Sequence, residues 1–148
     1  MHIFLTGPLQ SGKSTAIARY LVGRPEAPGG FRTHWDRAGG RLTLELLETG
    51  ETLSVATMEP HGVRADRAAF DAAGERLLSA PAGRRSLLLM DELGFLENDA
   101  HRFQAAVLAA LDGPVPVLAA VKPKDTDFLR RVRQHPHGEV FNITPESR

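Results

Sequence analysis

One segment near the start of the chain constrains its fold more than any other, Gly7-Pro8-Leu9-Gln10-Ser11-Gly12-Lys13-Ser14. It has the pattern G-x-x-x-x-G-K-S, follows the apolar stretch His2–Thr6 and precedes a helix expected from about Lys13 to Leu21. This strand–turn–helix order is the setting of a phosphate-binding P-loop, or Walker A motif. Its glycines let backbone N–H groups turn toward a triphosphate, and the helix N-terminus favours the anion. We therefore predict that these residues, together with Thr15, bind a nucleoside triphosphate such as ATP or GTP.

A second motif supplies the acids that such a site needs. The run Ser86–Met90 is continuously apolar, as is typical of a strand buried on both faces of a parallel sheet, and it ends in Asp91-Glu92. In P-loop enzymes an acid at this place, the Walker B position, holds Mg²⁺ opposite the Ser or Thr of the loop. We predict that Asp91 and Ser14 bind Mg²⁺ and that Glu92 is the general base for an attacking water. Lys13 is predicted to contact the β- and γ-phosphates.

Composition and length exclude several other classes of protein. The 148 residues predict one domain over 1–148, and 18 basic against 18 acidic side chains leave no net field to attract nucleic acid or an anionic membrane. Without cysteine, disulfides and thiolate metal sites are ruled out. The P-loop begins at residue 7, which leaves no room for a targeting peptide ahead of it, and no apolar run has the length of a membrane span. We expect a cytoplasmic protein with no nucleic-acid or membrane partner, and the sequence does not identify a protein partner.

Helical and strand patterns mostly alternate along the chain. Two stretches with period two, Arg41–Leu46 and Thr52–Thr57, flank a turn and predict a hairpin, whereas Arg24–Gly30 has the composition of a loop. Further helices are expected at 67–79, 99–111 and 126–134, and further strands at 115–121 and 139–143. The predicted fold is α/β, a three-layer P-loop NTPase sandwich in which helices flank a mainly parallel sheet with an inserted antiparallel hairpin.

Four segments together resemble the THEP-type nucleoside triphosphatases. The first is the N-terminal strand with its P-loop, and the second is Gly30-Phe31-Arg32-Thr33 followed by Arg37 and Gly39-Gly40-Arg41. The third, Asp91-Glu92-Leu93-Gly94-Phe95-Leu96-Glu97, is similar to the D-E-I-G-K-M-E signature of that family. The late strand Val115–Ala119 and the ending Thr144-Pro145-Glu146-Ser147-Arg148 complete the resemblance. Two positions depart from the family pattern, Phe95 in place of lysine and Ser147 in place of asparagine.

The resemblance implies Mg²⁺-dependent hydrolysis of nucleoside triphosphates to the diphosphate and phosphate, with broad base tolerance. Arg37 is the first candidate for an arginine finger by its family position, and Arg32 is the second. Without a finger in the same chain, turnover is expected well below the ~10 s⁻¹ typical of enzymes. Glu97 is either a support for the water shell of the metal or a surface acid.

Two other function classes remain open from the sequence. A nucleotide or small-molecule kinase would use the same P-loop, and the basic cluster of Lys122, Lys124, Arg130, Arg131 and Arg133 could then close on phosphates, although a solvated helix face is the more usual reading. A nucleotide-dependent switch would use residues 30–62 as a partner-facing insert, and an exposed apolar patch there would favour it. The pair His135 and His137 is more typical of a polar loop than of a metal site.

Overall fold

A computed structural model describes residues 1–7, 12–24, 27–36, 38–79, 86–94 and 96–143, with only the backbone of Ser14. Within these residues the strands are β1 (His2–Thr6), β2 (Gly29–Asp36), β3 (Arg41–Leu46), β4 (Thr52–Glu59), β5 (Gly62–Ala65), β6 (Leu88–Leu93), β7 (Val117–Val121) and β8 (Gly138–Asn142). The helices are α1 (Lys13–Val22), α2 (Arg67–Ser79), α3 (His101–Asp112) and α4 (Asp127–Arg133).

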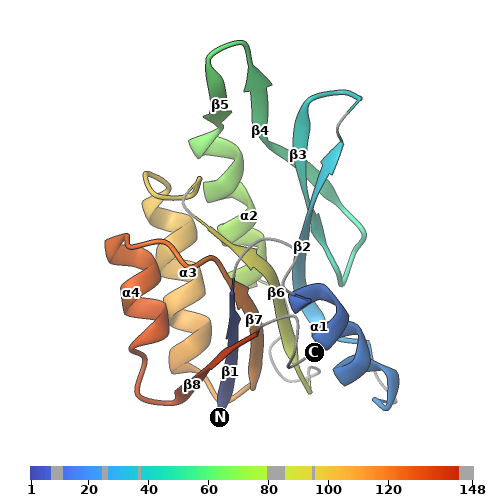
Figure 1. Cartoon of the computed structure of the whole chain (residues 1–148), viewed down its shortest axis with the longest axis vertical. Helices are drawn as coiled ribbons and strands as arrows, with labels where there is room; N and C mark the ends of the chain where they lie inside the picture. The colour runs from blue at the N-terminus through green and yellow to red at the C-terminus, as the bar shows by residue number, and fades with distance from the viewer. Residues whose placement is uncertain (8–11, 25–26, 37, 80–85, 95, 144–148) are drawn as a thin grey trace.

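The described strands form one mixed sheet in the order β5-β4-β3-β2-β6-β7-β1-β8. Pairing is parallel from β2 through β6, β7 and β1 to β8, and antiparallel from β2 through β3 and β4 to β5. Strand β7 therefore lies between β1, which leads into the P-loop, and β6, which carries the acid pair (Figure 1). This confirms the mainly parallel sheet with an antiparallel hairpin.

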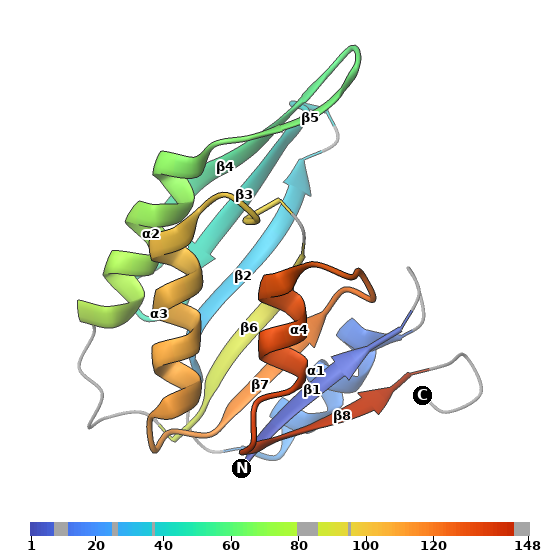
Figure 2. The ribbon, with the colours of Figure 1, turned by 90° about the vertical axis from the view of Figure 1, so that its left-hand side faces the viewer.

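Helices cover both faces of the sheet, as the three-layer prediction requires. Helices α2, α3 and α4 lie together on one face, and α1 lies on the other (Figure 2). The residues of β6 alternate between these layers, because Leu88 and Met90 join the large core under α2–α4 whereas Leu89 joins Leu5 and Ile17 under α1. The continuous apolar run that predicted this strand thus reflects burial on both faces.

Helix packing on the larger face depends on one close contact and one shared cap. A Cβ added to Gly74 of α2 would lie 2.8 Å from Cα of Phe103, so only glycine lets α2 and α3 approach this closely. In addition, the Asp71 carboxylate accepts hydrogen bonds from the backbone N–H groups of Arg102 and Phe103, which are otherwise unpaired at the start of α3. The two helices therefore hold each other in register.

The largest differences from the predicted elements concern β2, β5 and β6. Strand β2 begins at Gly29, inside the predicted loop, because Gly30 pairs with Leu89 of β6. The local sequence pattern does not predict this pairing. Strand β5 has only four residues, too few for a clear period. Strand β6 does not stop at Met90 but continues through the acid pair to Leu93, because its pairing with β7 extends to Val121.

Candidate functional site

Two of the predicted catalytic residues, Lys13 and Glu92, meet at the carboxyl ends of β1 and β6. In open α/β sheets this end of the strands is where ligands bind. Lys13 is the first residue of α1, and its Nζ lies 3.6 Å from Oε2 of Glu92 at the end of β6. The same Nζ donates a hydrogen bond to the carbonyl oxygen of Gly7 at 2.7 Å. The fold thus brings together two predicted site residues that are 79 positions apart in the chain (92 − 13).

The start of α1 is shaped by a glycine in a conformation that other residues rarely adopt. Gly12, which precedes the helix, has φ of 102° and ψ of 15°. Thr15 follows in the first turn of α1 with an exposed side chain. Of the other predicted nucleotide-binding residues, Pro8, Leu9, Gln10 and Ser11 lie outside the described residues, as does the side chain of Ser14.

Thr33 of β2 ties the acid pair to the neighbouring strand. Its hydroxyl donates to the carbonyl oxygen of Asp91 at 3.3 Å and accepts from the N–H of Glu92 at 3.2 Å. The pairing of β6 with β7 shifts by one residue between Asp91 and Leu93, so Glu92 has no Cα partner on β7. Irregular pairing of this kind redirects a side chain, and the Thr33 bonds supply the backbone contacts on the other side.

Burial dominates the electrostatics of the two acids. It raises the pKa of Asp91, and nearby positive charges, first that of Arg32, partly offset the effect. Burial also raises the pKa of Glu92, against the opposing charges of Lys13 and then Lys122. A carboxylate with a raised pKa holds a proton more readily, which suits a general base working near neutral pH.

Glu97 is an internal acid of the site region and not a surface residue. Its side chain is 3% exposed, and Oε2 accepts a hydrogen bond from the N–H of Gly94 at 3.1 Å. Its other oxygen, Oε1, is buried without a hydrogen-bond partner among the described residues. Burial raises the pKa of this carboxyl group, so a proton there is favoured. The Gln104 amide donates to the Glu97 carbonyl oxygen at 2.9 Å and fixes its backbone.

The donor set fits a magnesium ion that keeps most of its other ligands from water and substrate. Among the described residues, no three His, Cys, Asp or Glu side chains come together as a group able to hold a metal ion. Mg²⁺ is usually bound through one or two carboxylates together with substrate phosphates and waters. Asp91, half-buried beside the start of the P-loop helix, offers the single carboxylate that this mode requires.

Other residues singled out by the sequence occupy different places. Arg37 lies outside the described residues, as do Phe95 and Ser147. Arg32 stands opposite Asp91 in the β2–β6 register, next to the acid pair.

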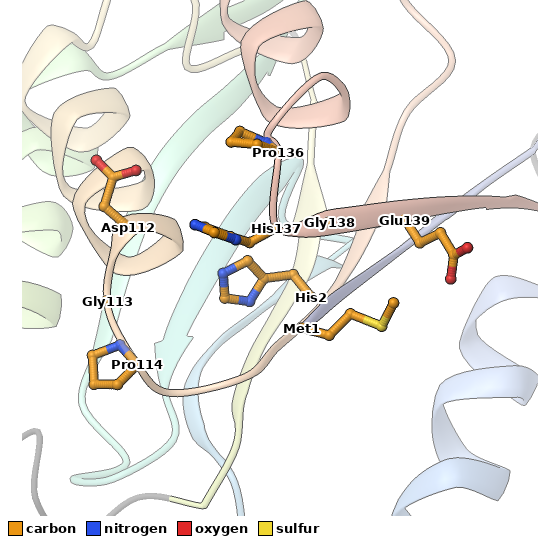
Figure 3. A pocket seen from close by; sticks show the side chains of 9 residues that line it. All are labelled: Met1, His2, Asp112, Gly113, Pro114, Pro136, His137, Gly138 and Glu139. Atoms are coloured by element: carbon orange, nitrogen blue, oxygen red, sulfur yellow. The ribbon is translucent and has the colours of Figure 1, made fainter.

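A pocket of about 750 Å³ lies at the opposite end of the sheet (Figure 3). Its lining includes His2, Asp112, His137 and Glu139, around the amino end of β1. His135, next to this pocket, binds Asp112 at 2.8 Å and forms no metal group with the other histidines of the described chain. Among the described residues, its lining contains no lysine or arginine to bind a triphosphate, and the pocket is separate from the P-loop end.

Comparison with known proteins finds relatives along the whole chain. Residues 2–148 match the protein family described as NTPase. The chain belongs to this NTPase family. It is 32% identical to nucleoside-triphosphatase THEP1 of Methanothermobacter thermautotrophicus, with all of the chain and 90% of that relative covered. The resemblance to THEP-type nucleoside triphosphatases is thereby confirmed.

Solved structures of this NTPase family share the fold. The crystal structure of THEP1 from Aquifex aeolicus superposes with a TM-score of 0.79 at 22% identity, covering all of this chain and 92% of that one. The solution structure of a human cancer-related nucleoside triphosphatase gives a TM-score of 0.74 at 26% identity, covering 98% and 89%. The predicted P-loop NTPase fold is therefore confirmed.

Two features of the NTPase site were not assigned a role by the sequence. Thr33 belongs to a segment noted for its family pattern, but only the β2–β6 pairing places its hydroxyl against the acid pair. Gly94 lies in the third motif, and the structure shows that the side chain of Lys122 crosses directly over it. Both contacts join segments far apart in the chain, and no local spacing predicts them.

Proposed function

We propose that this NTPase is a Mg²⁺-dependent enzyme that hydrolyses nucleoside triphosphates to the diphosphate and phosphate, with broad base tolerance and slow turnover. The observation that carries the proposal is the contact between Lys13 and Glu92, 3.6 Å apart at the carboxyl end of the sheet. A phosphate-binding cation and a carboxylate able to take a proton from water are the two groups that triphosphate hydrolysis needs side by side.

The described contacts suggest how substrate would rearrange the site. Lys13 contacts the Glu92 carboxylate and the Gly7 carbonyl oxygen. A triphosphate in the P-loop would take over the Lys13 ammonium, and Glu92 would then be available to hold a water molecule. The backbone N–H groups of the P-loop and Lys13 would stabilise the negative charge that spreads over the transferring phosphoryl oxygens.

The chemical step requires one water and one acceptor for its proton. The water oxygen attacks the γ-phosphorus, the bond to the oxygen between the β- and γ-phosphorus atoms breaks, and the proton passes to the Glu92 carboxylate. Ser14 and Asp91 are the residues that would hold Mg²⁺, which would neutralise charge on the β- and γ-phosphate oxygens. Thr33 would keep the Glu92 backbone in place during this step through its hydrogen bond.

The described arginines give little support to a kinase with a phosphate-closing lid. Arg130 of α4 pairs with Asp125 at 3.0 Å and also with Asp127, and Arg133 donates to backbone carbonyl oxygens. These groups shape the turn before α4. A partner-dependent switch has more support, because Trp35 and Met58 expose apolar side chains within residues 30–62 and Val63 does so directly after them.

Phosphate release from ATP, GTP, CTP and UTP with Mg²⁺ tests the proposal. We expect release from several of the nucleotides with kcat below ~10 s⁻¹, reduced at least about a hundredfold in Glu92→Gln. Lys13→Ala should abolish it, whereas Glu139→Gln, an exposed carboxylate change on β8, should not affect it. Tight nucleotide binding with no release above the Glu92→Gln level would refute hydrolysis, and oligomerisation driven by nucleotide would then support the switch.

A further inference from the structure

The turn after β7 begins between the two halves of the candidate site. Strand β7 has β1 on one side and β6 on the other, so the residue after Val121 emerges between the P-loop and the acid pair. That residue is Lys122. Its backbone N–H donates to the carbonyl oxygen of Leu93 at 2.9 Å, which fixes its backbone to the strand that carries Glu92.

The Lys122 side chain follows a path kept open by a glycine. A Cβ added to Gly94 would lie 3.2 Å from Cδ and 3.6 Å from Cε of Lys122. The same added atom would lie 3.6 Å from Oε1 of Glu97, so the lysine stem passes next to this buried carboxyl group. Burial raises the pKa values of Glu92 and Glu97, and the positive charge of Lys122 partly offsets this rise for both acids.

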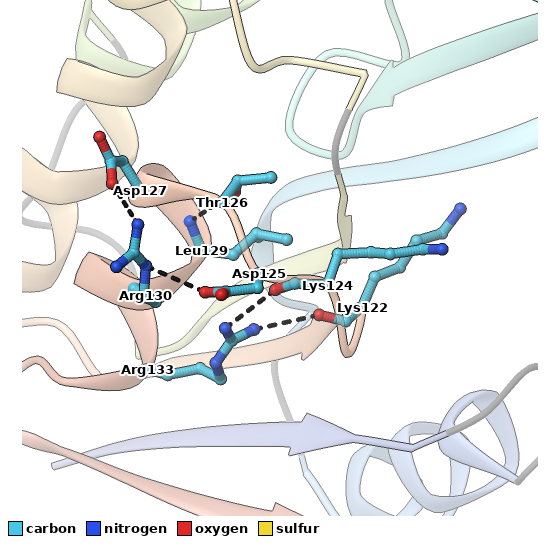
Figure 4. A network of polar contacts seen from close by, with 8 residues as sticks. All are labelled: Lys122, Lys124, Asp125, Thr126, Asp127, Leu129, Arg130 and Arg133. Atoms are coloured by element: carbon cyan, nitrogen blue, oxygen red, sulfur yellow. Dashed lines mark hydrogen bonds and ion pairs between the residues drawn. The ribbon is translucent and has the colours of Figure 1, made fainter.

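Arg133 of α4 holds the same turn from its other side. Its guanidinium donates to the carbonyl oxygens of Lys122 at 3.2 Å and of Lys124 at 2.9 Å. The Lys124 N–H also donates to the Lys122 carbonyl oxygen at 2.8 Å, which closes the turn. The two lysine side chains extend together away from Arg133 (Figure 4). The backbone of this short turn is thus fixed, and both lysine side chains leave it on the side away from Arg133.

We propose that Lys122 contacts the γ-phosphoryl group of a bound nucleoside triphosphate, and that Arg133 is a positioning residue that holds Lys122 by binding the carbonyl oxygens of its turn. The inference rests on the proposed function for its substrate. A lysine that emerges between the P-loop and the acid pair would meet the γ-phosphoryl group next to Lys13 and would make no contact with the α- and β-phosphates. Lys122 would therefore distinguish triphosphate from diphosphate.

Equilibrium binding separates this role from a merely structural one. The probes are ADP and a non-hydrolysable ATP analogue, each with Mg²⁺, and the variants are Lys122→Met, Arg133→Met and the double variant. Arg131→Met is the matched control, because Arg131 lies on the same helix with an exposed side chain. Circular dichroism and thermal unfolding establish that each variant is folded, and Arg133→Lys tests whether a cation alone restores the turn.

We expect Lys122→Met to weaken binding of the triphosphate analogue by about ten- to a hundredfold, the range for loss of a charged hydrogen bond, and to change ADP binding less than twofold. Arg133→Met should weaken binding of the analogue at least fivefold. The double variant should bind the analogue as tightly as Lys122→Met does, because both changes remove the same contact.

Equal loss of ADP and analogue binding in Arg133→Met, or additive losses in the double variant, would show a structural role and overturn the positioning claim. Unchanged analogue binding in Lys122→Met would overturn the phosphate contact. Binding is measured without turnover. Absence of hydrolysis by the wild type would thus refute the proposed function, whereas the binding results would still test the contact of Lys122 with the γ-phosphoryl group.

Discussion

Replacing Gly30 by alanine is expected to destabilise the junction between the antiparallel and parallel parts of the sheet. Gly30 lies in β2 with φ of +99°, a conformation that side chains with a Cβ rarely adopt. An added Cβ would lie 2.0 Å from the carbonyl oxygen of Leu89 and 2.8 Å from its nitrogen. Both atoms belong to the buried strand β6, which is paired on its other side with β7 and cannot move away.

Two physical costs add at this position. Holding a residue other than glycine at such a φ costs about 1–3 kcal/mol, and forcing extra volume into a packed interior costs about 1–3 kcal/mol more. We expect Gly30→Ala to lower the free energy of unfolding by about 2–6 kcal/mol, against a total of roughly 5–15 kcal/mol for a typical protein. In a chain of this length that corresponds to a fall in Tm of roughly 5–20 °C.

Urea and thermal unfolding followed by circular dichroism would measure this loss. Gly23→Ala is the matched control, because Gly23 has φ of −86° and an added Cβ would meet nothing within 4 Å. The control should change the free energy of unfolding by at most about 1 kcal/mol, in either direction. If the free energies of unfolding of Gly30→Ala and Gly23→Ala differed by less than about 1 kcal/mol, the inference that β2 and β6 approach too closely for a side chain at residue 30 would be wrong.

Two further changes probe the active end and the opposite end of the sheet. Thr33→Val removes both hydrogen bonds to the acid pair with little change in shape, so kcat for phosphate release should fall about ten- to a hundredfold while Thr33→Ser retains most of it. A wild-type kcat in the valine variant would contradict this positioning role. Burial lowers the pKa of His2, whose Nδ1 accepts from the Val117 N–H, so the stability that the neutral ring contributes is complete above about pH 6.5 and is lost as the pH falls below it. Urea unfolding should give a lower free energy of unfolding at pH 5 than at pH 7.5. His2→Gln should reduce this difference, and the exposed control His61→Gln should leave it unchanged. The same difference in both variants would rule out His2 as its cause.

Where the sequence carried strong local signals, the structure agrees closely. Helix α2 was expected at 67–79 and occupies Arg67–Ser79, because its buried residues recur at helical spacing. The hairpin of β3 and β4 follows from strict alternation, with Leu42, Leu44 and Leu46 buried in β3. Strand β1 and α1 flank the P-loop as that motif requires.

Where contacts join distant segments, the sequence was silent or ambiguous. Residues 29–36 carry glycine, arginine, threonine and histidine in place of an apolar period, and β2 forms because it pairs with β6, 58 residues or more away. From the sequence, Glu97 could be assigned either to the water shell of the metal or to the surface. The structure places it in the interior, where it forms hydrogen bonds with Gly94 and Gln104. Such pairings depend on the tertiary structure and cannot be predicted from the spacing of neighbouring residues.

The sequence by itself determined that this chain has a P-loop, an acid pair at the end of a buried strand and an α/β fold. These follow from local rules, since a turn of glycines, a helix start and an apolar strand are each encoded within a few neighbouring residues. Only the tertiary structure decided which groups face one another. The contact of Lys13 with Glu92, the bridge of Thr33 and the path of Lys122 over Gly94 all arise because the order of strands in the sheet differs from their order in the chain.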